Sequence, residues 1–311
     1  MVLGLLLLLS SWNLQANSKK YRTGNRSDAI IIPSPVINYV RPNLFWGNGK
    51  YAGPADIWNQ NKGFLVQSVN PESYNQNFPT TGLDGLYFDL LITGIEPEEL
   101  TWEPVTLGRI TATVTNVVAN NDYWIPWEDF AKVVARVKLT GPEARTQRNN
   151  PKPSQIAKPR LPQTFELVGR DRDGVEVVKY GFELRQWFVH RDNLNGYQHY
   201  SDQLAWCNGL GYRMSRVRDL SNAKCGIYWP FCSNGIDDSS SSGNYYQRRI
   251  GGGFFAEWGE PSYFGGKDFN SPYAVCWTSD KVGTTPFHVS LDGRVSNSSE
   301  GLPFDAICTT P

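Results

Sequence analysis

The stretch from Gln203 to Leu220, QLAWCNGLGYRMSRVRDL, constrains the fold more than any other, because it combines a helix, a cysteine and a turn. Ser201 can cap a short helix whose apolar positions, Leu204 and Cys207 among them, fall on one side. Gly209 stands where a left-handed helix end is favoured. We therefore expect a short cysteine-bearing helix in the last domain of the chain.

The end of the chain extends this pattern with a Trp-Thr-Ser strand and a final strand that carries Cys308. The order of these features resembles a C-type-lectin-like domain, over roughly residues 180 to 311. The motifs that carry the resemblance are Trp206-Cys207, Gly211-Tyr212-Arg213-Met214, Trp277-Thr278-Ser279, Leu291-Asp292-Gly293 and Ala306-Ile307-Cys308.

All five cysteines follow residue 200, which indicates an oxidising compartment. In the fold that the chain resembles, a cysteine on the first helix pairs with one on the last strand, and Cys207 and Cys308 match those places. The bridge would stabilise the domain by up to ~4.7 kcal/mol in the chain-entropy model; two buried free thiols are the alternative. We expect Cys225 and Cys232 to form a second, local pair, which leaves Cys276 unpaired.

The first 16 residues, MVLGLLLLLSSWNLQA, resemble a secretory signal peptide without a basic start. The apolar run is too short to span a bilayer, and Ala16 offers a cleavage site. The alternative is an N-terminal core strand or helix, although residues 17–29 are polar and are expected to be disordered. We therefore expect an exported protein, secreted or on the bacterial cell surface, with no membrane-spanning segment in the mature chain.

Residues 30–140 are expected to form an immunoglobulin-like β-sandwich. The longest β-rich runs are Leu86–Ile92, Ile110–Val118 and Val133–Leu139, separated by Gly, Asn and Pro turns. In Ile110–Thr115 apolar residues alternate with threonine, as in a half-buried strand. Short helical turns are possible at Asp56–Asn59 and Trp127–Ala131.

Residues 141–160 contain several prolines and basic residues and are expected to be an exposed linker or a long edge loop. Residues 161–311 are assigned to the C-type-lectin-like adhesion domain. This domain is predicted to begin with a hairpin around Asp173-Gly174, which could also pack against the first domain. The predicted fold class is mainly β, with an α+β C-terminal part.

A hairpin placed between a β-sandwich and a lectin-like domain is an arrangement similar to that in the adhesive tips of the bacterial invasin and intimin family. The resemblance covers most of residues 35 to 311. It implies binding to a host-cell surface protein or glycan without catalysis. The chain departs from the family because it has no outer-membrane barrel, peptidoglycan-binding segment or tandem repeats.

The loops between Cys225 and Asp280 are rich in glycine, serine and aromatic residues, a composition that suits binding to glycan or protein surfaces. The alternative is that many of these rings fill the core. The first domain is expected to act mainly as a spacer. The candidate binding residues are Asp237, Asp238, Tyr245, Tyr246, Trp258, Tyr263 and Asp268.

Other functional classes are disfavoured. The calcium-lectin triplets Glu-Pro-Asn, Gln-Pro-Asp and Trp-Asn-Asp are absent, so no metal or cofactor is expected. The formal net charge is zero, which argues against nucleic acid. No hydrolase or P-loop motif occurs, so an enzyme is not expected. The alternatives are a phage-tail-type or secreted receptor-binding protein and, less favoured, a formylglycine-generating-type enzyme of the same fold.

Overall fold

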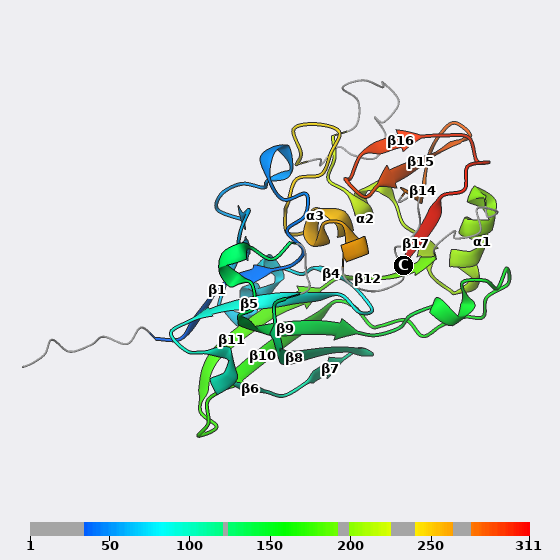
Figure 1. The fold of residues 1–311 in the computed structure, drawn as a ribbon. Coiled ribbons are helices and arrows are strands. Elements are labelled where there is room, and N and C mark those ends of the chain that lie inside the picture. Colours follow the sequence, from blue (N-terminus) through cyan, green and yellow to red (C-terminus); the bar gives the residue numbers. More distant parts are fainter. Residues whose placement is uncertain (1–33, 121–123, 192–198, 225–239, 264–274) are drawn as a thin grey trace, which may run out of the picture. The chain divides into compact units, whose positions relative to one another are not determined.

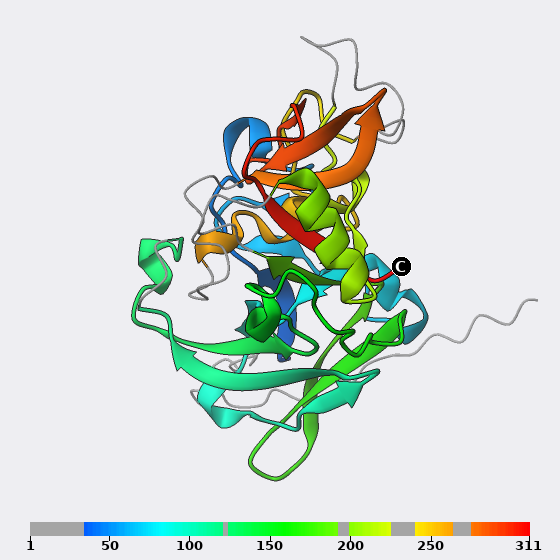
Figure 2. The same ribbon diagram turned by 90° about the vertical axis from the view of Figure 1, so that its right-hand side faces the viewer.

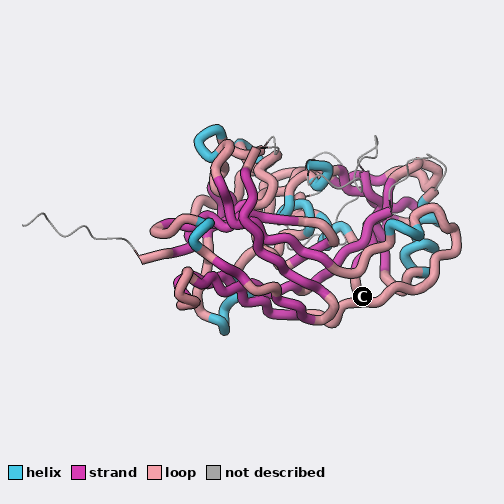
Figure 3. The backbone as a smooth tube through the Cα atoms, turned by 60° about the horizontal axis from the view of Figure 1, so that its bottom comes forward, coloured by secondary structure: helices cyan, strands magenta, loops and turns pink. Residues whose placement is uncertain are grey.

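The computed structural model describes residues 34–120, 124–191, 199–224, 240–263 and 275–311. Strands dominate this part of the chain and the helices are short (Figure 3). None of the described helices is long and apolar enough to cross a membrane. The predicted signal peptide, residues 30–33 of the predicted sandwich and the Cys225–Cys232 pair lie outside the described residues.

The larger sheet of the N-terminal sandwich has seven strands in the order β2-β3-β1-β5-β9-β8-β7, and every neighbouring pair is antiparallel (Figure 1). Its strands are β1 (Val36–Arg41), β2 (Trp58–Asn59), β3 (Gly63–Leu65), β5 (Tyr87–Thr93), β7 (Val105–Leu107), β8 (Ile110–Val118) and β9 (Val133–Thr140). The strand β8 has the expected bounds, and its alternation places Ile110, Ala112 and Val114 in the core while Thr115 is exposed. The segment Asp56–Asn59 forms a turn leading into β2 instead of a helical turn.

The smaller sheet of the sandwich has the order β11-β10-β6 and contains the expected hairpin. Its strands are β6 (Thr101–Trp102), β10 (Gln163–Arg170) and β11 (Glu176–Leu184). Gly174 has a φ of 79°, a backbone conformation that glycine adopts without strain. Phe88 of β5 contacts Phe182 of β11 with ring centroids 6.0 Å apart, so the two sheets share one core.

The C-terminal part is built on a mixed sheet with the order β16-β15-β14-β17-β12-β4, and β13 also pairs with β17 (Figures 1 and 2). Its strands are β4 (Thr81–Leu83), β12 (Gln186–Arg191), β13 (Arg213–Met214), β14 (Val275–Val282), β15 (Thr285–Ser290), β16 (Val295–Asn297) and β17 (Asp305–Thr309). The described helices are α1 (Tyr200–Gly209), α2 (Val217–Leu220) and α3 (Phe254–Trp258). A sandwich followed by this helix-and-sheet unit confirms the fold class expected from the sequence.

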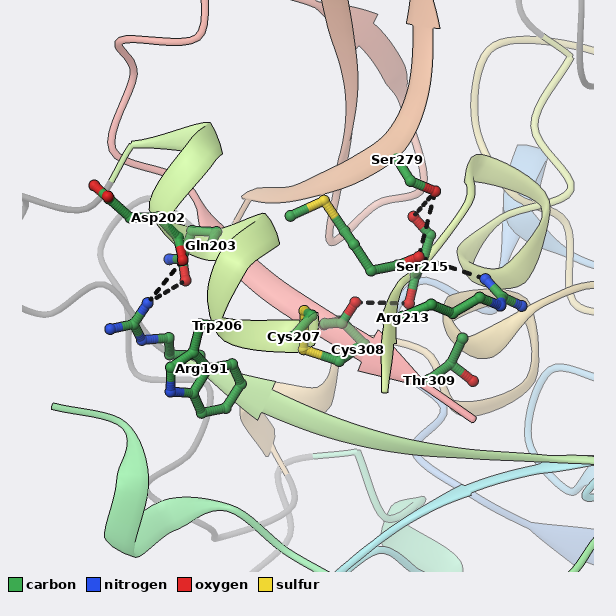
Figure 4. Close-up of a disulfide and its surroundings, with 12 residues drawn as sticks. Arg191, Asp202, Gln203, Trp206, Cys207, Arg213, Ser215, Ser279, Cys308 and Thr309 are labelled. Carbon is green, nitrogen blue, oxygen red and sulfur yellow. Dashed lines mark hydrogen bonds between the residues drawn. A yellow bond between two sulfur atoms is a disulfide. The ribbon is translucent and has the colours of Figure 1, made fainter. Parts of the chain in front are cut away.

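Helix α1 is joined to the last strand by a disulfide between Cys207 and Cys308, whose Cα atoms are 5.5 Å apart (Figure 4). The expected pairing is confirmed, and Cys276 is a buried free thiol. Two local predictions were wrong. The helix is capped by His199 instead of Ser201, because the His199 amide donates to Asp202 Oδ2 at 3.1 Å. The left-handed residue after the helix is Gly211, at φ 80°, instead of Gly209.

The two parts are closely joined, and residues Ser34–Pro311 form one compact unit. The strand β4 comes from the N-terminal half of the sequence but pairs in parallel with β12 of the C-terminal sheet. The proline-rich segment 141–160 lies along the C-terminal part, where the carbonyls of Gln147 and Ala157 accept hydrogen bonds from Trp206 and Tyr212. Because β10 and β11 complete the sandwich, we propose a domain boundary between Leu184 and Gln186.

Candidate functional site: an aromatic groove

Only three of the seven predicted binding residues have described side chains. Asp237, Asp238 and Asp268 lie outside the described residues. Tyr263 ends the short 3-10 helix η6 (Pro261–Tyr263), but its side chain also lies outside the described part. The structure therefore places Tyr245, Tyr246 and Trp258.

Trp258 and Tyr246 belong to the core, and the prediction that they contact a receptor must be corrected. Both side chains are fully buried. The Trp258 indole donates from Nε1 to the Thr81 carbonyl at 3.1 Å, and its ring packs edge-on against Phe78 at 4.8 Å. Burial also raises the pKa of the Tyr246 phenol above its ordinary value. These two rings fill the core in a region with little regular secondary structure, so neither ring is available to contact a receptor.

Tyr245 is half-buried at the contact between its loop and the N-terminal region. Its ring meets Tyr51 edge-on at 5.7 Å, and Lys50 Nζ lies 4.9 Å from its centroid. Tyr51 ends the 3-10 helix η1 (Gly49–Tyr51) and also contacts Trp46, with ring centroids 5.0 Å apart. A continuous row of aromatic rings thus leads from the predicted loop to Trp46.

The exposed large aromatic side chains of the described residues are Trp46, Trp127 and Phe130, with exposed fractions of 38%, 84% and 46%. The rings of Trp127 and Phe130 are stacked, with centroids 5.6 Å apart and an interplanar angle of 8°. Trp127 begins the 3-10 helix η4 (Trp127–Asp129), where a helical turn was expected. These three residues lie in the first domain, which was expected to act mainly as a spacer.

A groove with a volume of about 340 Å³ is lined in part by Trp46. We call it the aromatic groove. One wall is the loop before η1, and another is the turn between β2 and β3. Pro126, the residue before Trp127, also lines the groove. The lining side chains in the described part of the chain are all uncharged: Leu44, Phe45, Trp46, Asn48, Gln60, Asn61, Trp124 and Pro126.

The loop that carries Trp46 is fixed by two residues of the C-terminal part. Arg248 is fully buried and donates to the backbone carbonyls of Asn43 and Phe45, the latter at 2.8 Å. Burial lowers the pKa of Arg248 to about 10, so it remains charged at neutral pH. Glu260 accepts a hydrogen bond from Trp46 Nε1 at 2.9 Å. Trp46 itself has a φ of 52°, a conformation that non-glycine residues rarely adopt.

The opposite wall and the Trp127 turn are held in similar ways. Asn59 Oδ1 accepts from the amides of Asn61 and Lys62 at 3.0 and 3.1 Å, which fixes the tip of the β2–β3 hairpin. Asp129 at the end of η4 forms an ion pair with the buried Arg41 at 2.6 Å. The site is therefore largely pre-formed, with exposed rings on a fixed backbone.

The described residues hold no group of three or more His, Cys, Asp or Glu side chains placed to bind a metal. The thiol of Cys276 is buried, and burial raises its pKa well above the ordinary value. A thiol of this kind is a poor nucleophile, because the thiolate is the reactive species.

The sequence contains no pattern that distinguishes Trp46, Trp127 and Phe130 from buried aromatic residues. The nearest signal is the composition around Trp127, where Pro126, Glu128 and Asp129 favour a turn over a strand. A large aromatic residue inside a polar turn has few core neighbours within its own segment. That signal predicts exposure only weakly, because long-range packing buries Trp58 in a comparable setting.

No protein-family model matches this chain, and no curated protein matches its sequence. Among solved structures, the chain is similar in fold to invasin, a bacterial integrin-binding protein, with 12% identity and a TM-score of 0.49. That alignment covers 89% of this chain and 40% of the invasin structure. The chain is also similar to a C-terminal 282-residue fragment of intimin in complex with the intimin-binding domain of its translocated receptor. The identity is 11% and the TM-score 0.43, over 89% of this chain and 66% of the fragment.

A third similar structure is intimin from enteropathogenic E. coli, with 13% identity and a TM-score of 0.35. The alignment covers 75% of this chain and 90% of that structure. Invasin and intimin are also the proteins whose adhesive tips the sequence resembles. Likeness at these identities concerns the fold and carries no function from one protein to another.

Proposed function

We propose that this chain is the receptor-binding tip of an exported bacterial adhesin, which binds a host-cell surface protein or glycan without catalysis. The observation that carries the proposal is the exposure of three large aromatic rings, Trp46, Trp127 and Phe130. Trp46 lines the aromatic groove, and Trp127 directly follows Pro126 of its lining. An exposed tryptophan is unfavourable in water and is the residue type most often found at the energetic centre of interfaces.

The fixed backbone of the site supports the same proposal. Binding costs free energy when loops and side chains must become ordered, and a pre-formed surface avoids part of that cost. The Trp46 loop is already held by Arg248 and Glu260, and the Trp127 turn by Asp129 and Arg41. The hydrogen bonds and the ion pair that fix these loops do not require the rings of Trp46 and Trp127 to be exposed. A binding surface does require exposed rings, so their exposure supports a role in binding.

The test is binding of the purified exported chain to host cells, measured by flow cytometry for single alanine variants. We expect Trp127→Ala and Phe130→Ala to weaken binding at least ~10-fold if these rings are interface anchors. The matched control is Val69→Ala, which truncates a 74% exposed apolar side chain that does not line the aromatic groove. Thermal unfolding should be unchanged in all three variants, because the mutated side chains are exposed.

The alternative location for the binding site is the set of loops between Cys225 and Asp280, which the sequence analysis favoured. Tyr245→Ala tests them, because Tyr245 is half-buried and accessible from that loop. Full binding by the Trp127 and Phe130 variants, together with loss of binding by Tyr245→Ala, would move the site to the C-terminal loops. Protease or glycosidase treatment of the cells before the assay identifies the receptor as protein or glycan.

A further inference from the structure

The lining of the aromatic groove has a chemistry of its own, distinct from that of the exposed Trp127–Phe130 pair. Five of its residues are apolar or aromatic, and the other three, Asn48, Gln60 and Asn61, are carboxamides. Among the residues that the structure describes, no ionisable side chain lines it. A ligand with a formal charge would find no partner of opposite sign on these walls, so the lining favours a neutral ligand.

The three carboxamides are exposed, and within the described part of the chain their side chains make no hydrogen bond. Their backbones are nevertheless fixed: the Asn48 carbonyl accepts from the Tyr51 amide at 3.1 Å, and Asn59 holds the hairpin tip that carries Gln60 and Asn61. Each carboxamide offers two N–H donors and one acceptor oxygen. This combination matches a hydroxyl group, which both donates and accepts.

The aromatic walls provide the complementary apolar surface. Trp46 is partly exposed, and its indole orientation is set by the hydrogen bond to Glu260. Trp124 is 6% exposed, and its Nε1 has no hydrogen-bond partner among the described residues. A pyranose ring presents both kinds of surface, C–H groups that pack on an indole face and hydroxyls at its edge. The volume of about 340 Å³ lies within the ~300–1,000 Å³ range of small-ligand sites.

Lys50 and Lys62, which are close in sequence to lining residues, and Glu260, which accepts from Trp46, all have other partners. Lys50 Nζ lies over the rings of Tyr51 and Tyr245, and Lys62 Nζ lies 5.2 Å from the Tyr39 centroid. Glu260 accepts from Trp46 and from Ser262. Selection of a sialylated or sulfated sugar needs a cation directed at the ligand, and the described residues of the groove walls provide none.

We infer that the aromatic groove is a subsite for a neutral saccharide unit. The inference rests on the proposed receptor-binding function and specifies the chemistry of one part of that surface. The exposed face of Trp46 supplies the stacking surface, the buried Trp124 forms part of the apolar lining beneath it, and Asn48, Gln60 and Asn61 bind the hydroxyls. The described lining of the groove contains no carboxylate, the main ligand of calcium in proteins, so we expect binding without calcium.

The experiment applies the purified exported chain to an array of neutral galactose-, mannose- and N-acetylglucosamine-terminated oligosaccharides with their sialylated and sulfated counterparts, with and without chelator. We expect neutral glycans to bind equally in both conditions. In titrations followed by tryptophan fluorescence, Gln60→Ala and Asn61→Ala should each weaken the best neutral glycan about 5- to 10-fold, the usual effect of one hydrogen bond. The matched control, Gln155→Ala, removes an exposed carboxamide outside the groove and should bind normally.

Three outcomes would overturn the inference: no glycan binding, binding of acidic glycans alone, or neutral binding that both hairpin variants retain in full. The first of these leaves the proposed function intact if cells still bind the wild-type chain and lose the Trp127→Ala variant, since the receptor would then be a protein. If cells do not bind the wild-type chain at all, the proposed function itself fails.

Discussion

The carboxylate of Glu257 in α3 provides the sharpest test of how the two parts of the chain are joined. It is fully buried and accepts hydrogen bonds from the amides of Thr80 and Thr81 at 3.1 and 3.0 Å and from their hydroxyls at 2.7 and 2.6 Å. The Gly251 amide donates to it at 2.8 Å. Within the described residues no cation forms an ion pair with it, so these donors alone compensate its burial.

Replacing Glu257 by alanine removes the acceptor while the donors stay in place. The two threonine amides are buried, and an unsatisfied buried donor costs about 1–3 kcal/mol, so the free energy of unfolding should fall by roughly 2–6 kcal/mol. Removal of the buried charge offsets part of this loss. Guanidinium denaturation followed by tryptophan fluorescence measures the change. A loss below about 0.5 kcal/mol, the usual effect of a neutral surface substitution, would refute the role assigned to these contacts.

The pH dependence provides a second measurement on the same residue. Burial raises the pKa of Glu257, against the hydrogen bonds that lower it, so the folded chain holds this proton more tightly than the unfolded chain. The contribution of Glu257 to stability is therefore greatest at low pH and declines as the pH rises from the unfolded to the folded pKa. The stability deficit of Glu257→Gln should accordingly be larger at about pH 4 than at about pH 8, if the variant's only pH-dependent difference is this group.

Three further predictions follow from groups elsewhere in the chain. Non-reducing peptide mapping should recover Cys207 joined to Cys308, and iodoacetamide should label Cys276 only after denaturation, because that thiol is buried with a raised pKa; rapid labelling of the native chain would contradict this. N-terminal sequencing of the exported protein should begin near Asn17, and retention of Met1 would contradict the signal peptide. Burial lowers the pKa of His288 to about 4, so unfolded chains bind its proton more tightly and stability should fall as the pH drops from about 6.5 to about 4; a His288→Gln variant with the same pH profile would remove His288 as the cause.

The sequence predicted those features that depend on neighbours along the chain. The alternation in Ile110–Val118 defined β8, and Asp173-Gly174 defined the turn between β10 and β11. The sequence did not predict which aromatic side chains are buried, because contacts between segments far apart in sequence determine that burial. Trp258 and Trp127 both lie in short helical turns, yet Trp258 is enclosed by Phe78 and Thr81, while Trp127 is 84% exposed and stacks on Phe130. Local composition does not contain that difference, because the enclosing residues lie far away in sequence.

The parallel pairing of β4 with β12 has a consequence for how this protein can evolve. Domains that meet only through a linker can be exchanged by recombination, because each brings its own edges and core. Here the edge strand of the C-terminal sheet, Thr81–Leu83, precedes the hairpin β10–β11 in sequence. Glu257, which accepts from the Thr81 amide, follows that hairpin. A gene that acquired a new C-terminal part would leave β4 without its sheet and its carboxylate. The two parts must therefore diversify together, and sequence variation between related proteins is expected in surface loops instead of in exchanged domains.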